Sequence, residues 1–149
     1  MVTKWYYGII WLLIVVVFMS VVTAGCVQIT PQNRTTPTIT EAPGYMVITP
    51  QEAKDLIDRT PGLIIIDTST PQNFAKGHLP NAANYCIGDD SLNKTIPSLD
   101  KNTTYLVYSR AERASILGAK KLIDSGFPNV YRLKGEYQEW NYAGYPVEI

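Results

Sequence analysis

The residues best suited to chemistry lie together in the run from Thr104 to Ser115, which reads Thr-Tyr-Leu-Val-Tyr-Ser-Arg-Ala-Glu-Arg-Ala-Ser. Its apolar first half predicts a buried strand over 105–108, and the residues from Ser109 onward predict a tight loop that leads into a helix. A hydroxyl and two arginines in such a loop suit two kinds of chemistry. Ser109 could act as a nucleophile, or Arg110 and Arg113 could help the loop hold a small anion.

Nothing near Ser109 in the sequence activates its hydroxyl. A serine hydroxyl is a weak nucleophile unless a base removes its proton. The surrounding residues, Val-Tyr-Ser-Arg-Ala, lack the Gly-x-Ser-x-Gly turn of the α/β-hydrolases. The only histidine, His78, belongs to a Gly-His-Leu-Pro turn, where we expect it to form local hydrogen bonds. The sequence therefore argues against a serine hydrolase.

Alternating helices and strands must position this loop. Thr49-Pro-Gln-Glu52 predicts a helix start, because threonine can cap, proline suits the first position and Glu52 can complete a capping box. Further strands are predicted over 63–67 and 129–133, shorter ones over 46–48 and 82–85, helices over 114–125 and 135–142, and a polar connection with one helical turn over 87–103. This alternation predicts a parallel sheet that helices cover on both faces.

Two separated motifs resemble the signatures of rhodanese-like domains. The first runs from Asp67 to Ala82 and has Gly-His-Leu-Pro at 77–80 as its core. The second begins with Asn-Val-Tyr-Arg-Leu-Lys-Gly at 129–135 and ends with Ala-Gly-Tyr-Pro-Val at 143–147. The resemblance covers about residues 46–149. It implies a small α/β domain with a five-stranded parallel sheet flanked by helices, whose site is the loop that begins at Ser109.

The chain departs from this family at several positions of the loop. The resemblance implies that active members have a cysteine at the first loop position, where backbone N–H groups and a helix N-terminus stabilise its thiolate and persulfide. This chain has Ser109 there, and a hydroxyl cannot form a persulfide. The arginine that usually closes the loop before a serine falls at Ala114, followed by Ser115. Glu112 falls where glycine is common, and Glu136 replaces the second glycine of the closing Gly-Gly.

The candidate site is therefore the loop and the helix start, which we expect to bind a small anion or a protein partner. It consists of Ser109, Arg110, Ala111, Glu112, Arg113, Ala114 and Ser115. No catalytic residue is assigned, and two functions stay open. One is a domain that lacks sulfurtransferase activity, and the other is an active rhodanese-type sulfurtransferase that uses Cys86 or the thiol of a partner. No residue pattern indicates a metal or a cofactor, so neither is expected.

The N-terminus predicts a membrane tether. Residues 5–22 are almost wholly apolar, and Thr-Ala-Gly-Cys at 23–26 resembles the lipobox of lipoproteins. That resemblance implies cleavage before Cys26 and a lipid on its sulfur, and an uncleaved anchor helix is the alternative. Lys4, ahead of the apolar segment, places the domain on the extracytoplasmic side. Residues 1–26 are thus expected to be a signal peptide or an anchor.

The rest of the chain divides into a linker and one domain. Residues 27–44 are rich in Thr, Pro, Gln and Asn and predict a flexible linker, and residues 45–149 form the domain. The formal net charge is zero and the charges are interspersed, which argues against nucleic-acid binding. Of the two cysteines, Cys26 is expected to carry the lipid, so no disulfide is predicted for Cys86.

Overall fold

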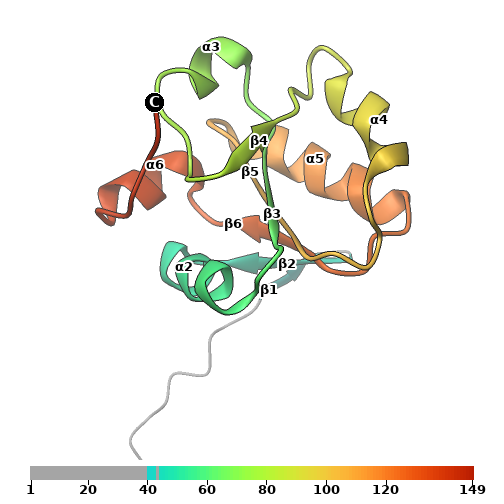
Figure 1. Cartoon of the computed structure of the whole chain (residues 1–149), viewed down its shortest axis with the longest axis horizontal. Coiled ribbons are helices and arrows are strands. Elements are labelled where there is room, and N and C mark those ends of the chain that lie inside the picture. The colour runs from blue at the N-terminus through green and yellow to red at the C-terminus, as the bar shows by residue number, and fades with distance from the viewer. Residues whose placement is uncertain (1–39, 43) are drawn as a thin grey trace, which may run out of the picture. The chain divides into compact units, whose positions relative to one another are not determined.

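A single mixed sheet organises the domain (Figure 1). The computed structural model describes residues 40–42 and 44–149. The predicted signal peptide or anchor over 1–26, with its lipid on Cys26, and most of the predicted linker over 27–44 lie outside the described residues. The strands are β1 (Thr40–Ala42), β2 (Tyr45–Ile48), β3 (Ile64–Asp67), β4 (Ala82–Asn84), β5 (Tyr105–Tyr108) and β6 (Val130–Leu133), in the order β1-β2-β6-β5-β3-β4. Only β1 and β2 pair antiparallel. The predicted five-stranded parallel sheet is therefore confirmed, with one antiparallel strand added at its edge.

That added strand lies inside the range expected to be linker. β1 pairs with β2 from Thr40 opposite Val47 to Ala42 opposite Tyr45. Gly44 stands between the two strands with φ +88°, a conformation that glycine adopts without strain. The sheet thus begins five residues before the predicted domain boundary at residue 45.

Four of the five helices fall in or near the ranges that the sequence predicts, and α3 was not predicted. They are α2 (Pro50–Arg59), α3 (Pro71–Phe74), α4 (Ser91–Thr95), α5 (Glu112–Asp124) and α6 (Glu136–Tyr142), with a 3-10 turn at Ile96–Ser98. The predicted capping box of α2 is present: Thr49 and Glu52 each accept a hydrogen bond from the other's main-chain N–H. No helix in residues 40–42 and 44–149 is long and apolar enough to cross a bilayer.

The start of α5 differs from the prediction in a way that matters for the site. α5 begins at Glu112 rather than near Ala114, because Ala111 is extended and its carbonyl already accepts from the N–H groups of Ala114 and Ser115. Only Ser109, Arg110 and Ala111 separate β5 from the helix. Four of the seven predicted loop residues, Glu112–Ser115, therefore form the first turn of α5.

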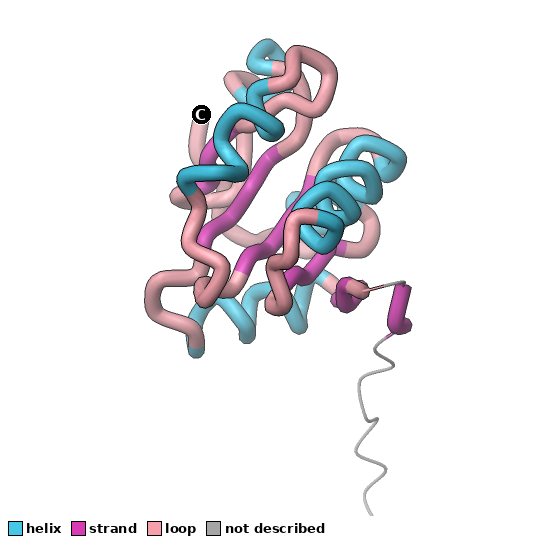
Figure 2. Tube along the Cα trace, turned by 90° about the vertical axis from the view of Figure 1, so that its right-hand side faces the viewer, coloured by secondary structure: helices cyan, strands magenta, loops and turns pink. Residues whose placement is uncertain are grey.

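Apolar residues cover the sheet on both faces, with helices on either side (Figure 2). Strand β5 shows the alternation: Tyr105 and Val107 pack on one face, and Leu106 and Tyr108 pack on the other. The first face holds Leu92 of α4 with Ala119 and Leu122 of α5, and the second holds Ala53 of α2 with Tyr137 and Trp140 of α6. Because β5 lies between β6 and β3, the loop that follows it sits at the centre of the sheet's carboxyl edge.

Candidate functional site

Ser109 is the first residue after β5, and it is almost fully buried at 1% exposure. Its main-chain N–H donates to Oε2 of Glu136 at 2.7 Å. Its carbonyl accepts from the N–H of Tyr137 at 3.1 Å. Gln138 extends the contact, because its side-chain amide donates to the carbonyl of Arg110 at 3.1 Å. The beginning of α6 therefore fixes the loop in place through consecutive residues.

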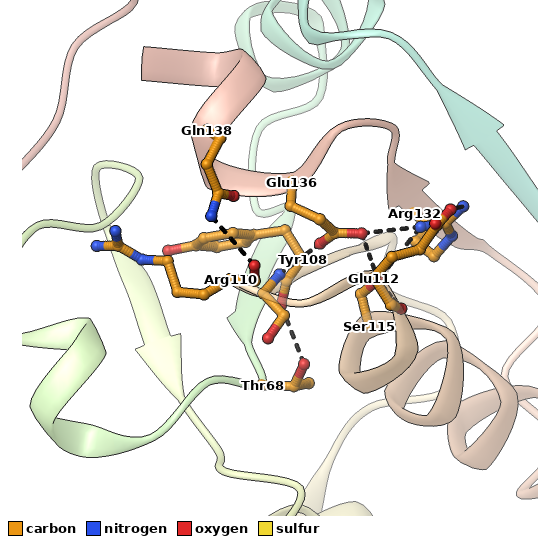
Figure 3. A network of polar contacts seen from close by, with 9 residues as sticks. Thr68, Tyr108, Arg110, Glu112, Ser115, Arg132, Glu136 and Gln138 are labelled. Carbon is orange, nitrogen blue, oxygen red and sulfur yellow. Dashed lines mark hydrogen bonds and ion pairs between the residues drawn. The ribbon is translucent and has the colours of Figure 1, made fainter. Parts of the chain in front are cut away.

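Glu136 reaches the loop because of an unusual turn between β6 and α6. Gly135 and Glu136 both adopt left-handed conformations, with φ of +73° and +61°. This turn directs the Glu136 side chain inward, where the residue is only 4% exposed. Its Oε1 accepts from the hydroxyl of Ser115 at 2.6 Å and from Nη1 of Arg132 at 2.8 Å (Figure 3). The carboxylate thus joins the loop, the first turn of α5 and strand β6.

Arg132 supplies the positive charge at the centre of this network. It projects from β6, its side chain is 6% exposed, and it also pairs with Glu112 at 3.1 Å. Burial raises the pKa of Glu136, and the hydrogen bonds from Ser115 and Ser109 and the charge of Arg132 oppose that increase. One guanidinium therefore faces two carboxylates, which leaves this cluster with an excess of negative charge when both are ionised.

The two loop arginines expected to hold an anion do not converge. The guanidinium of Arg110 lies over the ring of Tyr137, 3.5 Å from its centre, and donates to the carbonyls of Asn73 and Gly77. Arg113 is exposed on α5. Arg110 therefore joins the α3 region to α6 and does not form an anion site with Arg113.

The structure brings together only part of the predicted set. Ser109, Glu112 and Ser115 belong to the network, whereas Ala111 serves as the cap of α5 and Ala114 is half-buried without a polar side-chain atom. Sequence reasoning noted Glu136 as a departure but missed its partner Arg132. A charged residue within the apolar run of β6 was the available signal, because a buried charge needs a partner.

A cavity of about 610 Å³ opens beside the network. Its lining residues come from the start of α2, the loop after β5, the first residue of α5, and the turn and first residues of α6: Thr49, Pro50, Arg110, Glu112, Lys134, Gly135, Glu136, Gln138 and Glu139. Ser109 is not among them, whereas Glu136 lines the cavity and also contacts Ser109. A molecule in this cavity would therefore lie next to Glu136, whereas Ser109 does not line the cavity.

The remaining polar residues near the loop have structural roles. The Tyr108 hydroxyl accepts from the N–H of Leu79 at 3.0 Å, and burial, followed by the charge of Asp67, raises its pKa. His78 stacks on Phe74, and its Nδ1 lies 3.2 Å from the Phe74 carbonyl, so the predicted local hydrogen bonding is confirmed.

Cys86 follows β4 and is 6% exposed. Its sulfur accepts from the N–H of Gly88 at 3.3 Å. No group of three or more His, Cys, Asp or Glu residues within the described part of the chain is arranged to hold a metal ion.

Comparison with known proteins gives consistent results. The sequence model of the family described as Rhodanese-like domain matches residues 49–143. The Thiosulfate sulfurtransferase GlpE of Ectopseudomonas mendocina is 32% identical over 101 residues, which are 68% of this chain and 88% of that protein. The Rhodanese-like domain of an Anabaena protein is 25% identical with a TM-score of 0.61, covering 67% of this chain and 76% of that one. A rhodanese-related protein of Thermoplasma volcanium shares the fold, with 22% identity, a TM-score of 0.60, and coverage of 68% and 96%.

Proposed function

The chain belongs to the rhodanese-like domain family, and from that premise we propose that its domain does not transfer sulfur and serves as a binding module held at a membrane. Ser109 carries this proposal. It stands where the family resemblance places the nucleophilic cysteine, it is 1% exposed, and its main-chain N–H is bonded to the side chain of Glu136. Both the type of residue and its burial oppose sulfur transfer.

The chemical reason lies in the difference between oxygen and sulfur. Sulfur transfer requires a thiolate that takes the sulfane sulfur of a donor such as thiosulfate and passes it on as a persulfide. A serine oxygen cannot form that S–S bond, and its hydroxyl keeps its proton at neutral pH without a base. The ionisable side chain of Glu136 is hydrogen-bonded to Ser109, but it contacts the main-chain N–H of Ser109 rather than the hydroxyl.

We expect the binding module to bind a protein partner rather than a small anion. The hydroxyl of Ser115, the N–H of Ser109 and the guanidinium of Arg132 already bond to Glu136, so these donors are occupied in the natural chain. We expect thiosulfate, sulfate and phosphate to bind the natural domain no more tightly than chloride does, as isothermal titration can measure. The partner would instead contact the exposed Lys134, Gln138 and Glu139 at the rim of the cavity.

An active sulfurtransferase that uses Cys86 is the second candidate, and the names of the similar sulfurtransferases favour it. Against it stand the burial of Cys86 and its place after β4, two strands away from β5 in the sheet. Replacing Cys86 with serine separates the two candidates, because the second requires this thiol unless a partner supplies one.

The experiment is a sulfur-transfer assay from thiosulfate to cyanide. It uses residues 36–149, a compact unit that contains the residues 49–143 matched by the family model, together with its C86S variant and the GlpE sulfurtransferase of Ectopseudomonas mendocina as the positive control. We expect the natural domain and C86S to equal the protein-free rate. Transfer by the natural domain above that rate would overturn the proposal, and its loss in C86S would establish the second candidate.

The membrane part of the proposal rests on the sequence of residues 1–26, with the domain on the extracytoplasmic side. Its support is the apolar run over 5–22 and the lipobox-like residues that end at Cys26. Fractionation of cells that express the full chain, followed by protease treatment of intact spheroplasts, tests it. The chain should sediment with membranes and be digested from outside.

A further inference from the structure

We propose that the donors around Ser109 form a small-oxyanion site that the Glu136 carboxylate fills, so that the chain carries its own ligand there. The inference rests on the proposed function and deepens it, because it assigns a chemical state to the same loop. The ligand class is a group with adjacent oxygens and a negative charge: a carboxylate such as formate, or a tetrahedral oxyanion such as sulfate.

The first observation is the convergence of three donors from separate elements on one carboxylate. The Ser109 N–H at the end of β5 contacts Oε2 at 2.7 Å. The Ser115 hydroxyl in α5 and Nη1 of Arg132 in β6 contact Oε1 at 2.6 and 2.8 Å (Figure 3). Both oxygens are thus bound, and one donor is a buried guanidinium. Charge-assisted bonds of this kind are how proteins hold oxyanions.

The second observation is the backbone conformation that brings the carboxylate to these donors. Glu136 adopts φ +61°, a left-handed conformation that costs an ordinary residue free energy and costs glycine none. Its charge is also almost fully buried. The strong contacts of the carboxylate offset the cost of the left-handed backbone and the cost of burying the charge. We therefore attribute the acidic side chain at this position to the three donors and not to the turn.

The third observation is that Glu136 lies beside a cavity. The residue is 4% exposed, and it is one of those that line the 610 Å³ cavity. We expect removal of its side chain to open the three donors to that cavity. A free anion could then enter and take the place of the missing carboxylate, and formate reproduces it most closely in shape.

The test is rescue of a Glu136 variant by added anions. Glu136→Gly suits the left-handed backbone, and Glu136→Asn is a second variant whose short side chain tolerates the same conformation. The control is Asp124→Asn, which removes an exposed charge at the end of α5, outside the lining of the cavity. Thermal unfolding of all four proteins, residues 36–149, is measured in sodium formate, sodium sulfate and sodium chloride at equal ionic strength.

We expect formate or sulfate to raise the melting temperature of E136G and E136N by about 4 °C or more over chloride, with saturation. Sulfate stabilises folded proteins in general, so it should raise the melting temperature of the natural domain and of D124N by the same small amount, and formate should not raise either above its value in chloride. Where a variant is unfolded in chloride, refolding by formate or sulfate is the expected result. The inference is overturned when neither variant responds to these anions more than D124N does, or when the natural domain responds as much as the two variants.

The outcomes remain distinguishable from those of the proposed function. Sulfur transfer by the natural domain overturns the absence of activity without any anion measurement. A missing anion response in both E136G and E136N overturns the oxyanion site while the natural domain stays inactive. Direct titration of E136G with formate, beside the natural domain, gives the ratio of affinities, which we expect to be at least about tenfold, or about 1.4 kcal/mol.

Discussion

The main-chain N–H of Ser109 lies 2.7 Å from a carboxylate oxygen of Glu136, a residue 27 positions further along the chain. The contact joins the loop after β5 to the turn after β6, two neighbouring strands of the sheet. It is reinforced by the N–H of Tyr137, which donates to the carbonyl of Ser109. Position 109 and position 136 therefore form one structural unit, and their effects on function should not be additive.

Restoring a thiol at position 109 should not restore sulfur transfer while Glu136 is present. The carboxylate occupies the N–H that would stabilise a thiolate, and its negative charge raises the pKa of a neighbouring thiol. We expect S109C to equal the natural domain and S109C/E136G to exceed both by about tenfold or more, which corresponds to about 1.4 kcal/mol. The assay is thiosulfate-to-cyanide transfer, with thiolate absorbance followed against pH. Equal activity of S109C and the double variant would contradict this coupling.

Loss of Arg132 should be among the most damaging single changes in the domain. R132M leaves the buried carboxylate of Glu136 without its cation, and breaking such a buried pair costs about 3–5 kcal/mol. E112Q removes the charge of Glu112, the other partner of Arg132. Because the Glu112 side chain is 67% exposed, this change should lower the free energy of unfolding by less than about 1 kcal/mol. Urea unfolding of both variants measures the difference. Similar costs for the two would show that the buried pair contributes no more than the exposed one.

The stability of the natural domain relative to E136Q should fall as the pH rises through the acidic range. Burial raises the pKa of Glu136 in the folded protein, so the folded state keeps the proton at a pH where the unfolded chain has lost it. The groups that face this carboxylate are Arg132, Ser109 and Ser115. At pH values above the raised pKa, the difference in free energy of unfolding between the natural domain and E136Q should be constant. Urea unfolding from pH 4 to 8 measures it, and a difference that grew with pH would mean that Arg132 outweighs burial.

Gly118 in α5 should not tolerate alanine, although alanine favours helices. A Cβ at this position would lie 2.6 Å from the methyl group of Thr68 and 3.3 Å from Val107. Overpacking of this kind costs about 1–3 kcal/mol, which exceeds the gain in helix propensity of about 1 kcal/mol. T68S removes that methyl group and keeps the hydroxyl that donates to the Tyr108 carbonyl. The G118A/T68S protein should therefore recover part of the stability lost in G118A.

Cys26 should carry a lipid in a host that processes lipoproteins. Its sulfur follows the small residues Ala24 and Gly25 after an apolar segment, which is the arrangement that the lipobox resemblance uses. Labelling with a fatty-acid analogue should mark the natural chain and leave C26S unmarked, with C26S at a larger mass because cleavage fails. An unlabelled natural chain that remains in the membrane fraction would establish the anchor helix instead.

Much of the fold could be predicted because local signals agree with the tertiary structure. The continuous apolar run over Tyr105–Tyr108 predicted a strand buried on both faces, and all four of its residues are buried. Thr49 and Glu52 predicted the start of α2 through their capping box. Strand β1 was not predicted, because its residues Thr40–Ala42 have the composition of the linker and become a strand only by pairing with β2.

The position of the candidate loop could be predicted from the sequence, but the contacts of its residues could not. The position of Ser109 after β5 follows from the order of elements, whereas the contact with Glu136 depends on two consecutive left-handed residues that no periodicity reveals. Arg110 looked like an anion ligand because its charge is visible in the sequence. Its stacking on Tyr137 depends on where α6 lies, and that is a tertiary property.

The left-handed turn at Gly135 and Glu136 also has an evolutionary consequence. If S109C is inactive and S109C/E136G is active, a chain with serine at position 109 and glutamate at position 136 needs two substitutions to become a sulfur carrier. A single substitution at position 109 would then give natural selection no activity to favour. The glutamate in the turn would in that case make the change to a sulfur carrier improbable, while the surface of the domain could diverge toward other uses.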